Sequence, residues 1–162
     1  MSCSKHLNKF PNDIFIETGS LVGKGIKNAL KYGFKEIHSI EILKTNYDIC
    51  VKLFKDDKRV NLYLGDSAET LPYVLKNIKN KVTFLLDAHG PCFKCPILKE
   101  LKIILDHSNL IGVKHTIIID DAKYFNGKRE DFGFLNIADV KEIVNKYPLY
   151  IFNNNKKYIT IL

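Results

Sequence analysis

The sequence of 162 residues has no apolar run that approaches the length of a membrane-spanning helix, which needs roughly 20 consecutive apolar residues. Residues 1–12 are also too polar for the apolar segment of a signal peptide. These absences argue against a membrane protein and against an exported one. We therefore expect no membrane partner and a cytoplasmic location.

Arginine is scarce, because Arg59 and Arg129 are the only two, although the formal net charge is +7. Surfaces that read bases or grip phosphates favour arginine, whereas scattered lysine is an ordinary solubilising residue. The lysines here are spread along the whole chain. A basic surplus still favours anionic partners, so RNA remains a less favoured partner than a small molecule.

Cysteine is also sparse, with four residues in a chain that shows no export signal. Such thiols are expected to be reduced, which argues against a disulfide framework. His89, Cys92 and Cys95 have a spacing that could offer three zinc ligands, but no second Cys-x-x-Cys or His pair completes a tetrahedral site. A redox pair is the other alternative. We interpret Cys92 and Cys95 as free thiols on a loop over the site.

The chain does contain apolar runs of strand length that alternate with amphipathic segments of helix length. This alternation predicts a single α/β domain over residues 1–162 with a parallel sheet. Strands are predicted at Ile14–Glu17, Glu36–Glu41, Val60–Leu64, Val82–Leu86 and Thr116–Ile119. Helices are predicted near Gly25–Tyr32, Lys44–Lys55, Ala68–Asn77, Pro96–His107 and Ala138–Lys146.

The C-terminal residues depart from this alternation. Leu149–Phe152 and Lys157–Leu162 flank a turn of three asparagines, which predicts a β-hairpin. The sheet then has seven strands and closes on an antiparallel strand. Because the sheet of a Rossmann dehydrogenase normally ends with parallel strands, the hairpin favours another architecture.

Residues 14–25 join the first strand to the first helix through Gly19, Gly23 and Gly25. Glycine turns let the backbone approach a ligand, and the start of a helix presents free N–H groups. Glu17 at the end of the strand would repel a pyrophosphate, whereas it suits a cation. S-adenosylmethionine carries a sulfonium and an ammonium group, so we favour it over NAD.

Three strand-end signals follow one another in order: Glu17-x-Gly19-x-x-x-Gly23, Glu41 and Gly65-Asp66-Ser67. Together they resemble the class I S-adenosylmethionine-dependent methyltransferases over nearly the whole chain. The resemblance implies a three-layer Rossmann-like fold with a seven-stranded, mostly parallel sheet and an antiparallel last strand. It implies that the methionine part, the ribose and the adenine of the cofactor contact Glu17, Thr18, Gly19, Gly23, Glu41, Ile42, Asp66, Ser67 and Asp87.

Aspartates follow the fourth and fifth predicted strands at Asp87 and at Asp120-Asp121. They resemble the metal ligands of the small O-methyltransferases of the catechol and macrocin types, which implies that Asp87, Asp120 and Asp121 bind Mg²⁺ or another divalent cation. A hard cation takes several oxygen ligands and lowers the pKa of a bound hydroxyl. The alternative is that these acids cap the helices that follow.

Asp87 and His89 are the predicted catalytic residues. The neutral imidazole of His89 could take a proton from an acceptor hydroxyl or bind the metal. The other histidines, at positions 6, 38, 107 and 115, show no pattern of partners, and we expect them at the surface or in packing.

Aromatic residues at positions 124, 125, 132 and 134 either form a wall of the acceptor pocket or cover the core. Only residues 1–13 precede the first strand, so the pocket is open or is completed by the second subunit of a homodimer. We expect a methyltransferase, a transferase that methylates a hydroxyl of a small molecule or sugar.

Three alternatives remain. A short-chain dehydrogenase that uses NAD(P) would explain Thr18-Gly19-x-x-x-Gly23-x-Gly25 and a Tyr124-x-x-x-Lys128 pair, although Asn126-Gly127 predicts a turn between the pair. An RNA ribose methyltransferase would use the positive charge. A methyltransferase-like module without catalysis is disfavoured, because a degenerate site has no need for so many acids.

Overall fold

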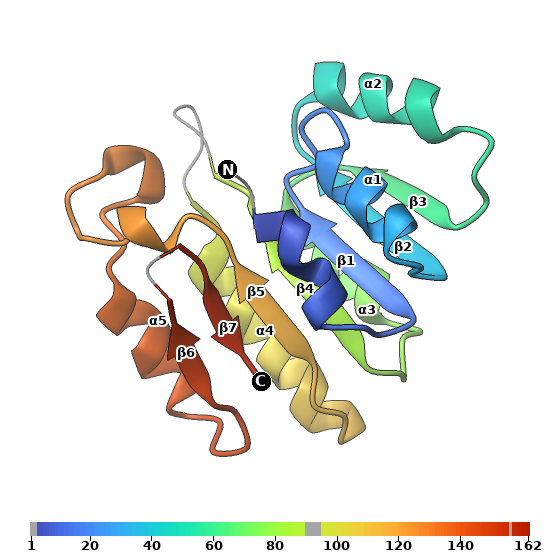
Figure 1. Ribbon diagram of the computed structural model, residues 1–162. Coiled ribbons are helices and arrows are strands. Elements are labelled where there is room, and N and C mark those ends of the chain that lie inside the picture. The colour runs from blue at the N-terminus through green and yellow to red at the C-terminus, as the bar shows by residue number, and fades with distance from the viewer. Residues whose placement is uncertain (1–2, 90–94, 156) are drawn as a thin grey trace.

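The computed structural model describes residues 3–89, 95–155 and 157–162, and shows helices on both faces of one seven-stranded sheet (Figure 1). The strand order is β3-β2-β1-β4-β5-β7-β6. The strands are β1 (Ile14–Thr18), β2 (Glu36–Glu41), β3 (Val60–Leu64), β4 (Val82–Leu86), β5 (Thr116–Ile119), β6 (Phe152–Asn154) and β7 (Ile159–Ile161). The α-helices are α1 (Lys24–Lys31), α2 (Lys44–Phe54), α3 (Ser67–Leu75), α4 (Ile97–Ile111) and α5 (Ile137–Val144).

The first five strands pair in parallel, whereas β7 runs antiparallel to both β5 and β6. The predicted α/β class and the antiparallel closing hairpin are therefore confirmed. The order reverses direction between β1 and β4, since the chain builds outward from β1 to β3 and then returns to β4. Ligands in open α/β sheets bind at such a switch point, beyond the carboxyl ends of the strands.

Several details of the elements differ from the predictions. β6 starts at Phe152 and includes two of the asparagines that were expected to form the turn. α4 continues to Ile111, where Gly112 with a φ of 67° ends it in the left-handed conformation. Short 3₁₀ segments at Cys3–Lys9, Ala122–Tyr124 and Glu130–Phe132 were not predicted.

Two apolar layers hold the sheet between the helices. Successive residues of a strand point to opposite faces, so Ile16 packs with α3, α4 and α5 while Phe15 packs with α1 and the first 3₁₀ segment. This gives the predicted three layers. Among the described residues, the helices are all too short or too polar to span a bilayer.

Candidate functional site

The carboxyl ends of the central strands form one continuous edge. Backbone hydrogen bonds extend the ladder past the strands, from Gly65 N–H to Glu41 O (2.9 Å), from Asp87 N–H to Thr18 O (3.1 Å) and from Asp120 N–H to Leu86 O (3.1 Å). The strand-end residues predicted for the donor and the metal therefore lie side by side along this edge.

The turn after β1 approaches the end of β4 closely. Gly19 has a φ of +84°, and a Cβ there would lie 2.6 Å from the backbone oxygen of Asp87. Gly23, with a φ of +76°, faces the ring of Phe54, which a Cβ would approach to 2.5 Å. Only glycine fits such positions without strain, so the turn is held by contacts within the chain.

Glu17 lies behind the turn and faces α1. Its carboxyl group is buried and accepts a hydrogen bond from Ser39 Oγ at 2.7 Å. Burial raises the pKa of Glu17 to about 8, so the group is largely neutral at pH 7. Glu17 therefore lies inside the fold, against Ser39 and α1, and its interaction with a cationic cofactor stays a prediction.

Glu41 is fixed in a different way at the end of β2. Its carboxylate accepts the backbone N–H groups of Leu21 at 2.7 Å and Leu43 at 2.8 Å, one on each oxygen. Each oxygen keeps a second acceptor position for a hydroxyl. Leu21 is 63% and Ile42 41% exposed. A fixed carboxylate beside exposed apolar side chains suits a ribose joined to a flat ring.

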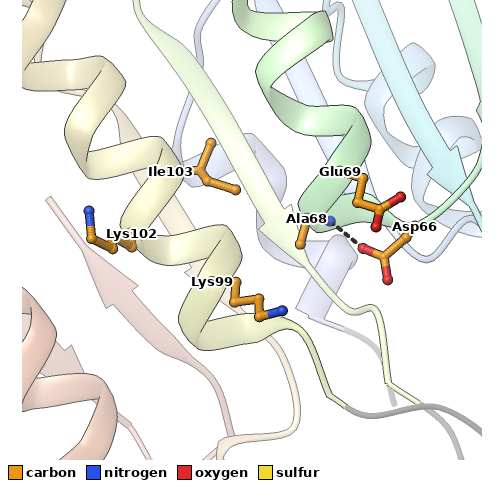
Figure 2. A pocket seen from close by; sticks show the side chains of 6 residues that line it. All are labelled: Asp66, Ala68, Glu69, Lys99, Lys102 and Ile103. Carbon is orange, nitrogen blue, oxygen red and sulfur yellow. Dashed lines mark hydrogen bonds between the residues drawn. The ribbon is translucent and has the colours of Figure 1, made fainter.

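The segment after β3 begins α3. Asp66 caps this helix, because its Oδ1 accepts the backbone N–H of Ala68 at 2.8 Å, while Ser67 is buried. A hollow of about 320 Å³ opens beside Asp66 between α3 and α4. Figure 2 shows Asp66 at the start of α3 on one side and Lys99 of α4 on the other. Asp66 thus has the capping role that the sequence analysis considered for Asp87, Asp120 and Asp121.

One cluster of possible metal ligands occurs among the described residues, and it consists of Asp87, His89 and Asp121. Their potential ligand atoms all lie within 4.8 Å of one another. The imidazole Nε2 of His89 lies 3.2 Å from Asp87 Oδ1 and 3.4 Å from Asp121 Oδ2. It makes no hydrogen bond of good geometry to either oxygen. The imidazole nitrogen and the two carboxylates are therefore not engaged in hydrogen bonds of good geometry with one another, and together they could bind one cation.

Asp120 differs from its neighbour. It is buried, and its Oδ1 accepts the backbone N–H of Asp121 at 2.8 Å. Asp121 has a left-handed φ of 55°, which turns its side chain toward His89. Of the three predicted ligands, the structure thus clusters Asp87 and Asp121 and adds His89, whereas Asp120 supports the turn.

The charges in the cluster depend on one another. Burial raises the pKa of Asp87, and the close approach of the His89 imidazole only partly opposes this. Burial disfavours the charged imidazole of His89, but Asp87, Asp121 and Asp120 outweigh it and raise its pKa. Three carboxylates around one imidazole leave an excess of negative charge that a divalent cation would balance.

The loop after β5 covers this cluster. The ring of Phe132 is buried and lies 4.3 Å, centroid to centroid, from that of His89. Arg129 lies over Tyr124 at 4.4 Å and pairs with Asp131. Phe125 is buried too, whereas Phe134 is exposed. The loop therefore both covers the core and forms one side of the candidate site.

The structure does not support the dehydrogenase pair. Tyr124 ends a 3₁₀ segment, and Gly127 before Lys128 has a φ of +72°. The two side chains therefore do not share a helix face. The zinc alternative cannot be placed, because Cys92 lies outside the described residues, while Cys50 and Cys95 are free thiols.

Glu100 is a residue that the sequence analysis missed. It lies in the first turn of α4 with its side chain fully buried, and neither carboxyl oxygen has a hydrogen bond of good geometry. Burial raises its pKa to about 7, with Ser67 and Thr18 opposing the shift. Its position on the apolar face of the helix, three residues after Ile97 and four before Ile104, was the signal.

Three of the other histidines also have partners. His38 Nδ1 lies 2.9 Å from Tyr63 Oη, and His107 Nδ1 lies 3.0 Å from His115 Nε2. His38 and His115 are buried, as expected for residues in packing. Their partners gave no pattern in the sequence, because the contacts join separate elements of the fold.

No family model matches this sequence, and a search of curated proteins finds no match. Solved structures do match. PaMTH1, an S-adenosylhomocysteine-bound methyltransferase from Podospora anserina, has 15% identity and a TM-score of 0.65, covering 98% of this chain and 74% of its own. The O-methyltransferase TomG from Streptomyces achromogenes, in complex with S-adenosylmethionine, has 11% identity, a TM-score of 0.66 and coverages of 98% and 75%.

A third similar structure is a putative caffeoyl-CoA O-methyltransferase from Staphylococcus aureus, with 17% identity, a TM-score of 0.61 and coverages of 98% and 79%. Such low identities establish the fold, which agrees with the strand order described above. This chain therefore has the fold of the class I S-adenosylmethionine-dependent methyltransferases.

Proposed function

We propose that this protein transfers a methyl group from S-adenosylmethionine to a hydroxyl group of a small molecule or sugar, with the help of a divalent cation. The observation that supports this most is the cluster of Asp87, His89 and Asp121 at the same strand edge as Glu41. Glu41 would bind S-adenosylmethionine, and the cluster would bind the acceptor oxygen beside it. Methyl transfer to oxygen needs the two reactants side by side in this way.

Of the residues proposed to bind S-adenosylmethionine, Glu41 has the best-defined geometry. Leu21 and Leu43 fix its carboxylate through their backbone N–H groups, so it would bind the two ribose hydroxyls without rearranging. Ile42 offers its exposed side chain to the adenine. Gly19 holds the methionine side close to Asp87. Glu17 and Glu100 are buried and would support these residues from inside the fold.

The donor set of the cluster indicates the type of cation. Two carboxylates and one imidazole fit Mn²⁺ or a similar transition metal, because imidazole is a poorer ligand for Mg²⁺. Asp87, His89 and Asp121 would hold it. A divalent cation in this position supplies a lower pKa for the acceptor hydroxyl.

The reaction breaks the bond between the sulfonium sulfur and the methyl carbon and forms a bond from that carbon to the acceptor oxygen. The hydroxyl proton is released, and the sulfur becomes the neutral thioether of S-adenosylhomocysteine. The residues contribute mainly by aligning the two reactants and excluding water. Phe132 excludes water from the cluster, because its buried ring covers His89.

Isothermal titration calorimetry with S-adenosylhomocysteine tests the donor half. We expect binding to the wild type, at least tenfold weaker binding to Glu41→Gln and unchanged binding to Glu142→Gln, an exposed acid on α5. NADH and NADPH are titrated in parallel. Binding of a nicotinamide cofactor in place of S-adenosylhomocysteine would overturn the proposal.

Titration with Mn²⁺ tests the cation half separately. We expect one site per chain, lost in His89→Ala and retained in His6→Ala. Mn²⁺ that binds equally to the wild type and to His89→Ala would refute the cation site while leaving the donor half intact.

A further inference from the structure

A second hollow, of about 530 Å³, lies at the opposite edge of the sheet from the candidate site. Ile14 and Glu36, the first residues of β1 and β2, line it on one side, and the end of α3 with the residues after it lines the other. We call it the amino-edge groove. Its volume falls within the roughly 300–1,000 Å³ of small-molecule sites, and the reaction proposed above makes no use of it.

Three rings form one wall of the groove. His38 and Tyr63 stack with centroids 5.8 Å apart and planes 19° from parallel, and Tyr73 meets Tyr63 edge-on at 6.4 Å. Tyr73 is 72% exposed, although it lies on a well-packed helix whose Val74 and Leu75 are buried. A large ring held open to solvent beside two others offers a face on which a flat ligand can stack.

Hydrogen bonds keep this wall rigid. His38 Nε2 lies 2.8 Å from Glu36 Oε1, and a carboxylate can only accept, so Nε2 donates. In the neutral imidazole, Nδ1 is then the acceptor for the Tyr63 hydroxyl at 2.9 Å. Because both rings are oriented before any ligand arrives, binding would cost little side-chain entropy.

The residues that follow α3 carry cations and amides. Lys76 and Lys79 are exposed there, together with Asn77 and Asn80. Among the residues that line the groove, Lys76 and Lys79 carry two positive charges, and the single carboxylate, that of Glu36, is already paired with His38. This side of the groove therefore favours an anionic group, and the asparagine amides can both donate to and accept from the edge of a heterocycle.

We propose that the amino-edge groove binds a nucleoside phosphate, with its base against Tyr73 and its phosphate between Lys76 and Lys79. The ligand is a free nucleotide or one unit of single-stranded RNA, since both present the same ring and phosphate. Stacking on aromatic side chains with lysines along the phosphates is how proteins hold such units without reading sequence. The site is separate from the proposed donor site and does not depend on methyl transfer.

The test uses uridine 5′-monophosphate in calorimetry, with S-adenosylhomocysteine present to occupy the donor site. Tyr73→Ala removes the stacking face, and Lys76→Ala/Lys79→Ala removes the phosphate contacts. The matched control is Lys52→Ala/Lys55→Ala, which removes two exposed lysines from the α2 region. All three changes are at exposed positions, and circular dichroism confirms folding.

We expect the groove variants each to weaken binding at least about fivefold, and the control to change it less than about twofold. Binding should also weaken with salt in the wild type and less so in the lysine variant. An octamer of uridylate that binds at least tenfold tighter than the monophosphate assigns RNA as the source, whereas equal binding assigns the free nucleotide. Binding that survives Tyr73→Ala, or that the control weakens equally, would overturn the proposal.

Discussion

The carboxyl group of Glu17 lies directly against the backbone of Gly25, so that a Cβ at position 25 would overlap its Oε2. Gly25 does not have a left-handed φ, which means that space alone requires glycine here. The third glycine of the motif therefore serves a buried acid of the preceding strand, and the pattern that suggested a cofactor loop reflects internal packing at this position.

Gly25→Ala should consequently destabilise the protein by about 2 kcal/mol, the usual cost of overpacking. Urea unfolding of the purified variant measures this. In a Glu17→Ala background the added methyl group meets no carboxyl group, so its cost should fall by half or more, as expected for residues in contact. Equal costs in both backgrounds would show that the two residues do not interact.

Asp120 and Asp121 are adjacent in sequence but should differ in their effect on cation binding. Asp121→Asn removes a charge from the cluster with Asp87 and His89 and should weaken Mn²⁺ binding at least about tenfold. Asp120→Asn keeps an oxygen that accepts the backbone N–H of Asp121, so it should change binding by no more than about threefold. Calorimetry of the two variants distinguishes these roles, and the reverse order would restore Asp120 as a ligand.

The sequence predicted the sheet well because the signal was local. Runs such as Val82–Leu86 are apolar except for Thr83 where both faces of a strand are buried, and the strand ends placed Glu41, Asp87 and Asp121 on one edge. His89 was already a candidate metal ligand, but the separation of Asp120 from the cluster could not be predicted, since it depends on the left-handed turn at Asp121. Contacts such as His38 with Tyr63 were missed because periodicity along one segment says nothing about which strands become neighbours.

Glu100 should make the protein less stable as the pH rises. Burial raises its folded pKa to about 7 from the ordinary value of 4.5, so the unfolded chain releases its proton first. The stability that the neutral carboxyl group contributes is complete below pH 4.5 and is lost as the pH rises through 7. Glu100→Gln cannot ionise and should gain on the order of 2 kcal/mol relative to the wild type between pH 5 and 8.

Unfolding in urea at a series of pH values measures this difference. Glu142→Gln, an exposed acid of α5 that pairs with Lys146, is the matched control and should follow the wild-type curve. A Glu100→Gln curve parallel to that of the wild type would mean that Glu100 is ionised in the folded protein.

His107 and His115 should act in the opposite direction. The backbone N–H of Val82 donates to His115 Nδ1 at 3.3 Å, so the proton of the neutral His115 ring is on Nε2 and is donated to His107 Nδ1. His107 then carries its own proton on Nε2 and donates it to Ile78 O at 3.1 Å. This series of hydrogen bonds requires both rings to be neutral, because Nδ1 of each ring accepts a hydrogen bond.

Burial accordingly lowers the pKa of both rings, that of His115 to about 4. The unfolded chain takes up protons near pH 6.5, so stability falls as the pH drops from 6.5 toward 4. We expect a loss on the order of 2 kcal/mol over that range, reduced in His107→Gln, where the second charge is absent, and unchanged in His6→Gln. Long-range ¹H–¹⁵N spectra at pH 6 should show the proton of His115 on Nε2. A proton on Nδ1 would break the chain of donors and remove the reason for this acid sensitivity.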